Sequence, residues 1–202
     1  MLLLNGSDIN KSFSGETLFE NVSFNVYDKD KIGFVGVNGA GKSTLFKIIT
    51  GEVEYDSGDL SKSREAKIGY LEQHPVSDST RTVMEEILTV FSEVTAVEEQ
   101  LAGVQKDLEN RNGDMNALIS RQAALQERFM ALDGTHYKSK IRSVLTGLGF
   151  SEDVFEMPLG NLSGGQKTRI ALGKLLLRKP DLILLDEPTN HLDMNSIAWL
   201  ET

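Results

Sequence analysis

The stretch that most constrains the fold of this chain is the glycine-rich segment Gly36–Thr44, which fits the pattern G-x-x-x-x-G-K-[S/T]. The apolar run 32–35 before it is suited to a buried strand, and residues 45–49 after it have helical spacing and stop at Gly51. A strand, a glycine loop and a helix in this order hold a nucleoside triphosphate, because loop N–H groups and the helix N-terminus surround the phosphates. An accidental glycine-rich turn does not require this context on both sides. The segment therefore predicts a nucleotide site.

The side chains of this loop have separate expected roles. The Lys42 ammonium is expected to reach the β- and γ-phosphates, and the Ser43 hydroxyl is expected to bind Mg²⁺. The other loop residues that we expect to contact the nucleotide are Gly36, Asn38, Gly39, Ala40, Gly41 and Thr44.

The composition limits the classes of protein to consider. The chain has 202 residues, 40% of them hydrophobic and 25% charged, which suits one large domain or a core with a smaller subdomain. No apolar run approaches the roughly 20 residues that span a bilayer, so no membrane insertion is expected. Cysteine is absent, which excludes a disulfide framework and leaves the cytoplasm as the expected location. The net charge of −9 argues against broad nucleic-acid binding, but not against a local contact by one projecting element.

The N-terminal third has the patterns of strands. Residues 2–9 and 21–27 are predicted strands, and apolar and polar residues alternate in the second, as in a half-buried antiparallel sheet. Between them, residues 11–15 are predicted to form a polar loop that carries Phe13, whose simplest role by itself is to cap the edge of a core. Within residues 56–73, a turn is predicted to precede a strand pair.

The middle of the chain has a heptad pattern. From Val83 to Leu108, apolar residues recur at alternating spacings of four and three, which predicts one coiled-coil helix about 40 Å long. A second run from Met115 to Leu132 includes Gln122, and a short polar turn joins the two runs. An antiparallel helical hairpin follows from this arrangement. A third helix is predicted across residues 141–148.

The C-terminal part combines a helix start with a strand that ends in acids. Ser163 and Gln166 have the spacing of a capping box, so a helix is predicted to begin there. Residues 182–185 form an apolar run that predicts a buried parallel strand ending at Asp186 and Glu187, where open α/β sheets bind ligands. We expect Asp186 to hold Mg²⁺ through water and Glu187 to act as general base. A solvated acidic turn is the alternative, and the phosphate loop upstream favours the functional interpretation.

Together these motifs resemble the nucleotide-binding domain of ABC ATPases. The resemblance covers nearly the whole chain and is carried, in order, by residues 36–44, Gln73, Leu162-Ser163-Gly164-Gly165-Gln166, residues 182–188 and Leu192-Asp193. It implies an α/β fold of the P-loop NTPase type, in which a parallel core and an antiparallel β subdomain carry an inserted α-helical subdomain. It also implies an ATPase activity that requires ATP and Mg²⁺.

The resemblance implies further site residues. Phe13 would stack on adenine, Gln73 would contact Mg²⁺ and the attacking water, and Asp193 would lie in the D-loop that crosses a dimer interface. The signature residues would bind the γ-phosphate of ATP held by a partner domain, and they are Ser163, Gly164, Gly165 and Gln166.

Two features resemble the ABC-F class, whose members carry two such domains on one chain and act on ribosomes. Residues 187–193 match the sequence motif of that class. The predicted hairpin, about residues 83–132, lies where members of the class carry their arm. The implied division is an ATPase core of residues 1–80 and 158–202 and a helical subdomain of residues 81–157. A transporter ATPase is the alternative, although its helical subdomain is compact. DNA-repair and chromosome-structure ATPases have far longer coiled coils.

The resemblance also implies what a partner must supply. The switch histidine of the family has no counterpart, since the histidines are His74, His136 and His191, and we expect the chain to be an N-terminal fragment. The missing partner would be a second ABC domain or the other copy in a head-to-tail homodimer. By itself the chain is expected to bind Mg·ATP weakly and to hydrolyse it little.

The turn of the hairpin is a candidate contact with the ribosome. Lys106, Asn110, Arg111 and Asn112 cluster there, where contacts with the phosphates of rRNA or tRNA, or with a ribosomal protein, are expected. Acidic residues outnumber basic ones across the hairpin. An enlarged helical subdomain without a nucleic-acid contact therefore remains the alternative.

Overall fold

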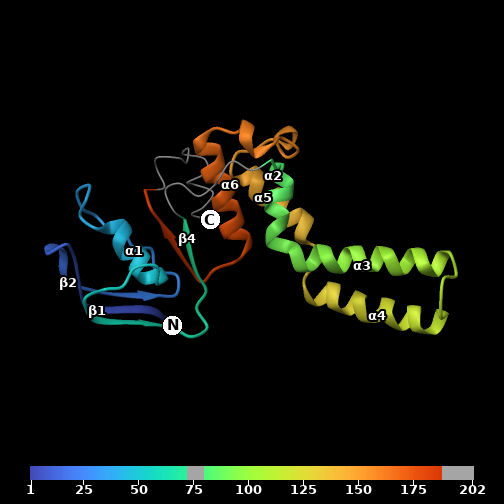
Figure 1. The fold of residues 1–202 in the computed structure, drawn as a ribbon, viewed down its shortest axis with the longest axis horizontal. Coiled ribbons are helices and arrows are strands. Elements are labelled where there is room, and N and C mark those ends of the chain that lie inside the picture. Colours follow the sequence, from blue (N-terminus) through green and yellow to red (C-terminus); the bar gives the residue numbers. More distant parts are fainter. Residues whose placement is uncertain (72–79, 188–202) are drawn as a thin grey trace. The chain divides into compact units, whose positions relative to one another are not determined.

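The structure is a computed structural model, and it describes residues 1–71 and 80–187. The chain divides into two compact units, each described by itself below (Figure 1). The first consists of Met1–Pro75 and Lys179–Asn190, and the second of Val76–Arg178 and His191–Thr202. The polypeptide thus leaves the first unit for the second and returns to it.

An antiparallel sheet of three strands forms much of the first unit. Its order is β2 (Glu16–Tyr27), β1 (Leu2–Phe13) and β3 (Ser57–Lys62). In β2 the side chains from Val22 to Val26 alternate between partly or fully buried apolar residues and exposed polar ones. The predicted alternation, which places one face of an antiparallel sheet on the core, is therefore confirmed.

The connection between the first two strands is shorter than the predicted loop. Ser14 and Gly15, with φ values of 52° and 86°, form the turn, and Lys11–Phe13 belong to the strand. Two consecutive residues with positive φ are typical of the tight hairpin turns that match strand twist. The expected loop at 11–15 therefore reduces to its last two residues, because the backbone of the other three pairs with β2.

The predicted strand pair within residues 56–73 is wrong. The strand β3 begins at Ser57 and pairs with β1, whereas β4 (Ile68–Leu71) pairs in parallel with β5 (Leu182–Leu185). Apolar alternation identifies a strand but does not identify its neighbour, and here both neighbours are distant in sequence. The parallel pairing predicted for residues 182–185 is confirmed, although Leu184 is the one fully buried residue of that strand.

The helix α1 (Lys42–Thr50) shares one hydrophobic core with both sheets of the first unit. Leu45, Phe46 and Ile49 of this helix cluster with Leu4 of β1 and Leu184 of β5. Edge-to-face aromatic contacts extend this core, with ring centroids 5.7–6.0 Å apart, among Phe24, Phe34, Phe46 and Tyr70. The helix that follows the glycine loop and the strand that ends in acids are therefore packed around the same interior.

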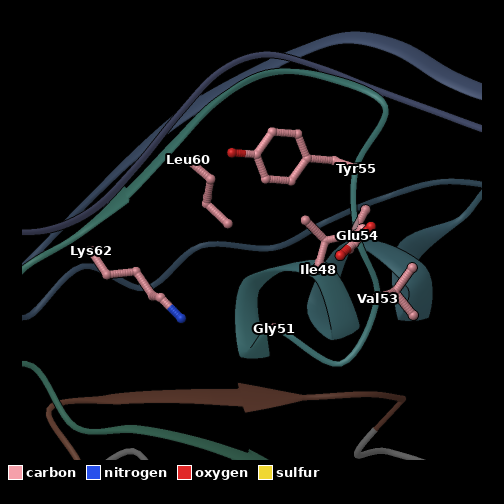
Figure 2. Close-up of a pocket in the computed structure, with 7 residues that line it drawn as sticks. All are labelled: Ile48, Gly51, Val53, Glu54, Tyr55, Leu60 and Lys62. Atoms are coloured by element: carbon pink, nitrogen blue, oxygen red, sulfur yellow. The ribbon is translucent and has the colours of Figure 1, made fainter.

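A pocket of about 390 Å³ lies beside the C-terminal end of α1 (Figure 2). Ile48, Tyr55 and Leu60 line it, and the ammonium of Lys62 donates a hydrogen bond of 3.1 Å to the carbonyl of Ile49. This bond places a cation where the helix dipole is negative, which stabilises the end of the helix. The pocket contains none of the predicted site residues.

The predicted buried strand at residues 32–35 is absent. Residues 31–37 have no regular secondary structure, and Val35 and Val37 are 99% and 80% exposed. A strand exists only where its backbone pairs with neighbours, and among the described strands β4 and β5 pair with each other and not with this segment. Of residues 32–35, only Phe34 packs on the core. The apolar composition of this segment therefore predicted a burial that does not occur, because the segment pairs with no described strand.

The second unit contains the predicted helical hairpin. The helices α3 (Ser92–Glu109) and α4 (Met115–Ala131) run side by side and are joined by a short turn (Figure 1). Val97, Val104 and Leu125 are its buried centre. The heptad pattern therefore predicted the hairpin and its packed face correctly.

The first heptad run is nevertheless not one helix. A 3₁₀ turn at Thr89–Phe91 separates α2 (Val83–Leu88) from α3, whose 18 residues make a helix about 27 Å long instead of about 40 Å. The seam residues Ile87 and Val94 stay buried on both sides of this turn, so the hydrophobic pattern does not reveal it. At the other end, Met115 is 38% exposed beside the hairpin turn, although the pattern placed it in the seam.

The helix α6 (Gly164–Leu177) packs against both α5 (Tyr137–Gly147) and α2. The predicted third helix is confirmed, and its Ile141 and Leu145 are fully buried. Two 3₁₀ turns, Glu152–Val154 and Leu159–Asn161, connect α5 to α6. The base of the hairpin is tied to α5 because the Glu98 carboxylate accepts a hydrogen bond from Tyr137 and pairs with Lys138 at 2.7 Å.

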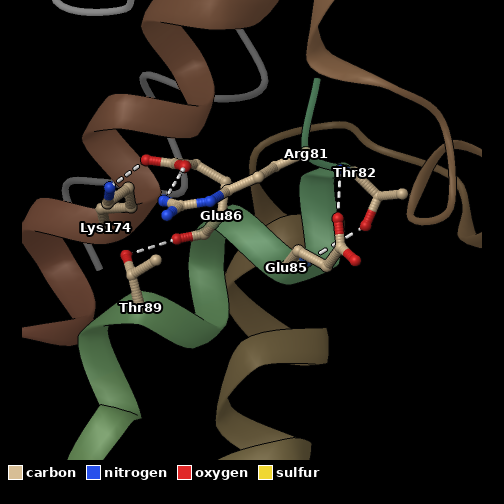
Figure 3. A network of polar contacts seen from close by, with 6 residues as sticks. All are labelled: Arg81, Thr82, Glu85, Glu86, Thr89 and Lys174. Carbon is tan, nitrogen blue, oxygen red and sulfur yellow. Dashed lines mark hydrogen bonds and ion pairs between the residues drawn. The ribbon is translucent and has the colours of Figure 1, made fainter. Parts of the chain in front are cut away.

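A polar network joins α2 to α6 (Figure 3). The Glu86 carboxylate pairs with Lys174 of α6 and, at 3.3 Å, with Arg81. Thr82 and Glu85 form a capping box at the start of α2. Partial burial raises the pKa of Glu86, but the hydrogen bonds and charges of Lys174 and Arg81 outweigh it and hold that pKa below its ordinary value.

Replacing Lys174 with methionine is expected to destabilise the chain by about 1–2 kcal/mol at neutral pH, because the Glu86 charge loses its nearest partner. A carboxyl whose folded-state pKa is lowered contributes stability above its unfolded pKa. That contribution disappears as pH falls through the folded-state value, so the difference between wild type and variant should shrink below about pH 4. Urea unfolding at several pH values measures this difference.

The matched control is Arg142→Met, which breaks an ion pair with Glu152 whose two side chains are about two-thirds exposed. We expect it to cost less than about 0.5 kcal/mol at every pH, since exposed pairs contribute little. Equal losses for the two variants would show that the position of Glu86 between two helices has no energetic consequence.

Candidate nucleotide-binding site

The loop from Gly36 to Thr44 has a backbone that only glycine supports at its centre. Gly39 and Gly41 have φ values of 85° and 88°. A Cβ at Gly41 would lie 2.7 Å from the Phe19 ring, closer than packing allows. The second and third glycines of the segment thus give the loop its turn and bring it close to β2.

The start of α1 has N–H donors without protein partners. Gly41 is the N-cap, no side chain caps the helix, and no acid lies in its first turn. Among the described residues, nothing accepts a hydrogen bond from the N–H groups of Lys42, Ser43 or Thr44, whereas the Ala40 N–H donates to the carbonyl of Val37 at 3.2 Å. Such a helix start is the arrangement that binds anions elsewhere in proteins.

The Lys42 ammonium lies within the curve of this loop. It donates hydrogen bonds of 2.9 and 3.1 Å to the carbonyl oxygens of Gly36 and Val37. These bonds hold the cation over the loop instead of in solvent. A cation and several unpaired N–H groups around one glycine turn fit the charge and the donor pattern that a chain of phosphates requires.

The two predicted acids follow β5. Asp186 is 8% exposed and Glu187 has a φ of 48°, so the chain turns sharply as it leaves the strand. Because α1 and β5 share one core, the packing fixes the elements that carry Ser43 and Asp186 relative to each other. A hydroxyl and a carboxylate are oxygen ligands of the kind that Mg²⁺ prefers. In residues 1–71 and 80–187, no group of three or more His, Cys, Asp or Glu side chains is placed to hold a metal ion.

The predicted capping box of the signature is confirmed. The Gln166 N–H donates to Ser163 Oγ at 3.3 Å, and the Ser163 N–H donates to Gln166 Oε1 at 2.9 Å. The helix α6 begins at Gly164, directly after its cap. These residues belong to the second unit, whereas the glycine loop belongs to the first.

Of the remaining predicted site residues, Phe13 lies in the described part of the chain and the others do not. Phe13 lies at the tip of the β1–β2 hairpin and is 50% exposed, so its ring is accessible and does not cap a core. Gln73 and Asp193, and also His191, lie outside the described residues. Their roles stay predictions.

One polar cluster beside Phe13 was not predicted from the sequence. The Asp56 carboxylate pairs with Lys11 at 3.0 Å and accepts a hydrogen bond of 2.6 Å from the Ser12 N–H. The sequence predicts only a turn at residues 56–59, followed by a strand pair. Only the pairing of β3 with β1 brings these residues together, and no local sequence signal indicates it.

A glycine loop that opens a helix, with an acid at the end of a parallel strand in the same core, defines the class of P-loop nucleotide-binding proteins. The sequence pattern of the ABC transporter family matches residues 19–190. The chain belongs to this family, whose ATP-binding domain it represents, and the predicted resemblance and α/β fold are confirmed.

Curated relatives give the same assignment. Putative ATP-binding protein YdiF of Bacillus subtilis is 50% identical over 202 residues, 100% of this chain and 32% of that protein. ABC transporter F family member 5 of Arabidopsis thaliana is 41% identical over 96% of this chain and 29% of its own length. Energy-dependent translational throttle protein EttA of Escherichia coli K12 is 39% identical over 91% of this chain and 33% of its own length. The chain thus spans about a third of the length of these relatives.

Solved structures agree on the fold. An ATP-binding subunit of an ABC transporter superposes with a TM-score of 0.67 at 20% identity, covering 98% of this chain and 71% of the other. The cbiO1 protein of Clostridium perfringens gives a TM-score of 0.62 at 22% identity, over 99% and 71% of the two chains. In the described part of this chain, no helix combines the length and apolarity needed to cross a bilayer.

Proposed function

We propose that this chain is one ATP-hydrolysing half of an ABC-F protein that acts on the ribosome in the cytoplasm. The observation that carries the proposal is the α3–α4 hairpin, which projects from the helices of the second unit in place of a compact subdomain. The names of two relatives support it, since one belongs to an F family and the other is called a translational throttle. Under this proposal the whole protein would act in translation, in its regulation, in the rescue of stalled synthesis or in antibiotic resistance.

ATP would be held by the glycine loop and by Phe13 at the tip of the β1–β2 hairpin. Lys42 would neutralise charge on the β- and γ-phosphates, and the unpaired N–H groups at the start of α1 would hydrogen-bond the phosphate oxygens. Phe13, half-exposed at its turn, would stack on adenine. The loop residues in direct reach of the phosphates would be Gly36, Asn38, Gly39, Ala40, Gly41, Ser43 and Thr44.

Hydrolysis would depend on the acids after β5. Glu187 would orient the attacking water and accept its proton, which is general-base catalysis. Ser43, Gln73 and Asp186 would hold Mg²⁺, an ion that neutralises phosphate charge when bound. The burial of Asp186 supports this role, because a buried carboxylate requires a compensating cation or donor.

The site would need a second ABC domain. In that arrangement Ser163, Gly164, Gly165 and Gln166 bind the γ-phosphate of ATP held by the partner, and Asp193 lies at the interface. The start of α6 offers N–H donors and a positive dipole end for this purpose. The partner is the other half of the same protein or a second copy, head to tail. We further propose that residues 1–80 and 158–202 form the ATPase core and residues 81–157 the helical subdomain.

The turn of the hairpin would contact the ribosome. Arg111, with a φ of 53°, and Lys106 are exposed, and neither makes an ion pair with any residue of the described ranges. Exposed apolar side chains continue along α4, where Ile119 and Met130 are 54% and 71% exposed. Cations at a projecting turn and apolar residues along its flank suit a contact with RNA or with a ribosomal protein.

The test is co-sedimentation of the full-length protein with ribosomes after Lys106 and Arg111 are both changed to glutamate. Reversal of two charges at the proposed contact should reduce ribosome-bound protein at least tenfold at low salt, and ATP binding should not change. The control exchanges Lys29 and Arg64, two exposed cations of the first unit, for glutamate. Unaltered sedimentation of the turn variant would contradict the ribosome contact.

A second candidate is the nucleotide-binding subunit of an ABC transporter. It is favoured by the superposition on a transporter ATP-binding subunit, which reflects the shared fold. Such a subunit would co-purify with a membrane-embedded partner. It would not need the turn residues Lys106 and Arg111, so the same double variant separates the two proposals.

A further inference from the structure

The Asp56 carboxylate holds the tip of the β1–β2 hairpin, which carries Phe13 and is called the hairpin tip below. The Asp56 carboxylate binds two successive residues just before Phe13, the Lys11 ammonium through Oδ1 at 3.0 Å and the Ser12 N–H through Oδ2 at 2.6 Å. The Asp56 N–H donates in turn to the Asn10 carbonyl at 2.9 Å. Backbone and side-chain contacts from Asp56, directly before β3, thus hold Asn10, Lys11 and Ser12 of β1.

The same cation lies against the aromatic ring. The Lys11 ammonium is 4.9 Å from the centroid of the Phe13 ring and lies over one of its faces. The Lys11 side chain is only 12% exposed, whereas Phe13 is 50% exposed. Asp56 therefore fixes a cation on one ring face, and the accessible part of the ring is left for another partner.

The charge state of Asp56 supports this arrangement. The hydrogen bonds from Lys11 and from the Ser12 N–H hold the pKa of Asp56 below its ordinary value. The carboxylate is accordingly charged at neutral pH and can balance the Lys11 ammonium. Without it, only the cation–π attraction would oppose the side-chain entropy of Lys11, so the ammonium would be held less firmly against the ring.

We infer that Asp56, acting through Lys11, is a positioning residue for the nucleobase: it orients the Phe13 ring so that adenine stacks on the face opposite the ammonium. The inference rests on the proposed ATP site and on the role of Phe13 in it. A cation on one face withdraws electron density from the ring, which favours stacking of an electron-rich purine on the other face. Base affinity then depends on a residue that does not touch the nucleotide.

Asp56→Asn tests this inference, because asparagine keeps an acceptor for the Ser12 N–H and removes the charge that holds Lys11. Isothermal titration calorimetry of the purified chain should show ATP binding weakened about fivefold. Binding of inorganic tripolyphosphate, which has no base, should be unchanged. Lys11→Met should weaken ATP binding by a similar factor, and the double variant should be no weaker than either single one.

The matched control is Asp59→Asn, three residues further on in β3, which removes the same charge at a residue whose backbone pairs with Ser7 and not with the hairpin tip. It should bind ATP as wild type does. ATP affinity in Asp56→Asn equal to that of wild type would overturn the inference, as would an equal loss of tripolyphosphate affinity, which would indicate a general disturbance of the loop. A wild-type chain that takes up tripolyphosphate but not ATP would instead contradict the proposed function itself.

Discussion

Replacing Lys42 with alanine is expected to lower ATP affinity at least 100-fold. The Lys42 ammonium is the cation held within the glycine loop, 2.9 and 3.1 Å from two loop carbonyls. Its removal leaves the phosphates with N–H donors and no compensating side-chain charge, and charge-assisted bonds to phosphate are among the strongest in proteins. A loss of roughly 3 kcal/mol in binding free energy corresponds to this factor. Isothermal titration calorimetry measures it directly.

The control for this variant is Lys47→Ala, on the same helix and five residues further on. It removes the same charge and keeps helix propensity, but its side chain is remote from the loop, so ATP affinity should stay within about twofold. Circular dichroism of both variants tests the fold. A Lys42 variant that is folded and binds ATP like wild type would exclude the glycine loop as the phosphate site.

The second large effect concerns hydrolysis. Glu187→Gln is expected to slow phosphate release at least 100-fold and to leave ATP affinity close to that of wild type, because an amide cannot accept the proton of the attacking water. The rate is best measured with protein in excess over ATP, so that slow turnover by the chain alone is still resolved. Loss of a general base lowers the rate of the chemical step without removing binding contacts.

Asp186→Asn provides a sharp contrast at the neighbouring position. This substitution should weaken the dependence of ATP binding on Mg²⁺, since it removes the carboxylate expected to hold the ion. Glu156→Gln, at an exposed acid in the second unit, should change neither property. If the Glu187 and Asp186 variants had the same effect on affinity and on rate, the two acids would not have the separate roles proposed here.

Local patterns in the sequence predicted those features whose cause is local. The glycine loop and α1 follow from nine consecutive residues, and the capping box of Ser163 and Gln166 follows from their spacing. The hairpin follows from a heptad period, because residues three and four apart in a helix lie on one face. The seam residues Val97, Val104 and Leu125 are accordingly buried.

Features that depend on distant partners were predicted less well. The strand expected at residues 32–35 did not form, and β3 was assigned the wrong neighbour. The helix expected from Val83 to Leu108 is interrupted at Thr89–Phe91, where α2 packs with α6 and α3 packs with α4. A continuous heptad period does not record this change of partner, since the seam stays buried on both sides.

The sequence alone determined the family, the phosphate loop, the acidic strand end and the hairpin, because each depends on residues close together in the chain. Only the tertiary structure decided that Asp56 meets Lys11 beside Phe13, and that Glu86 of α2 meets Lys174 of α6. These contacts join residues 45 and 88 positions apart. They arise from strand pairing and helix packing, which are properties of the whole core and which no short sequence pattern specifies.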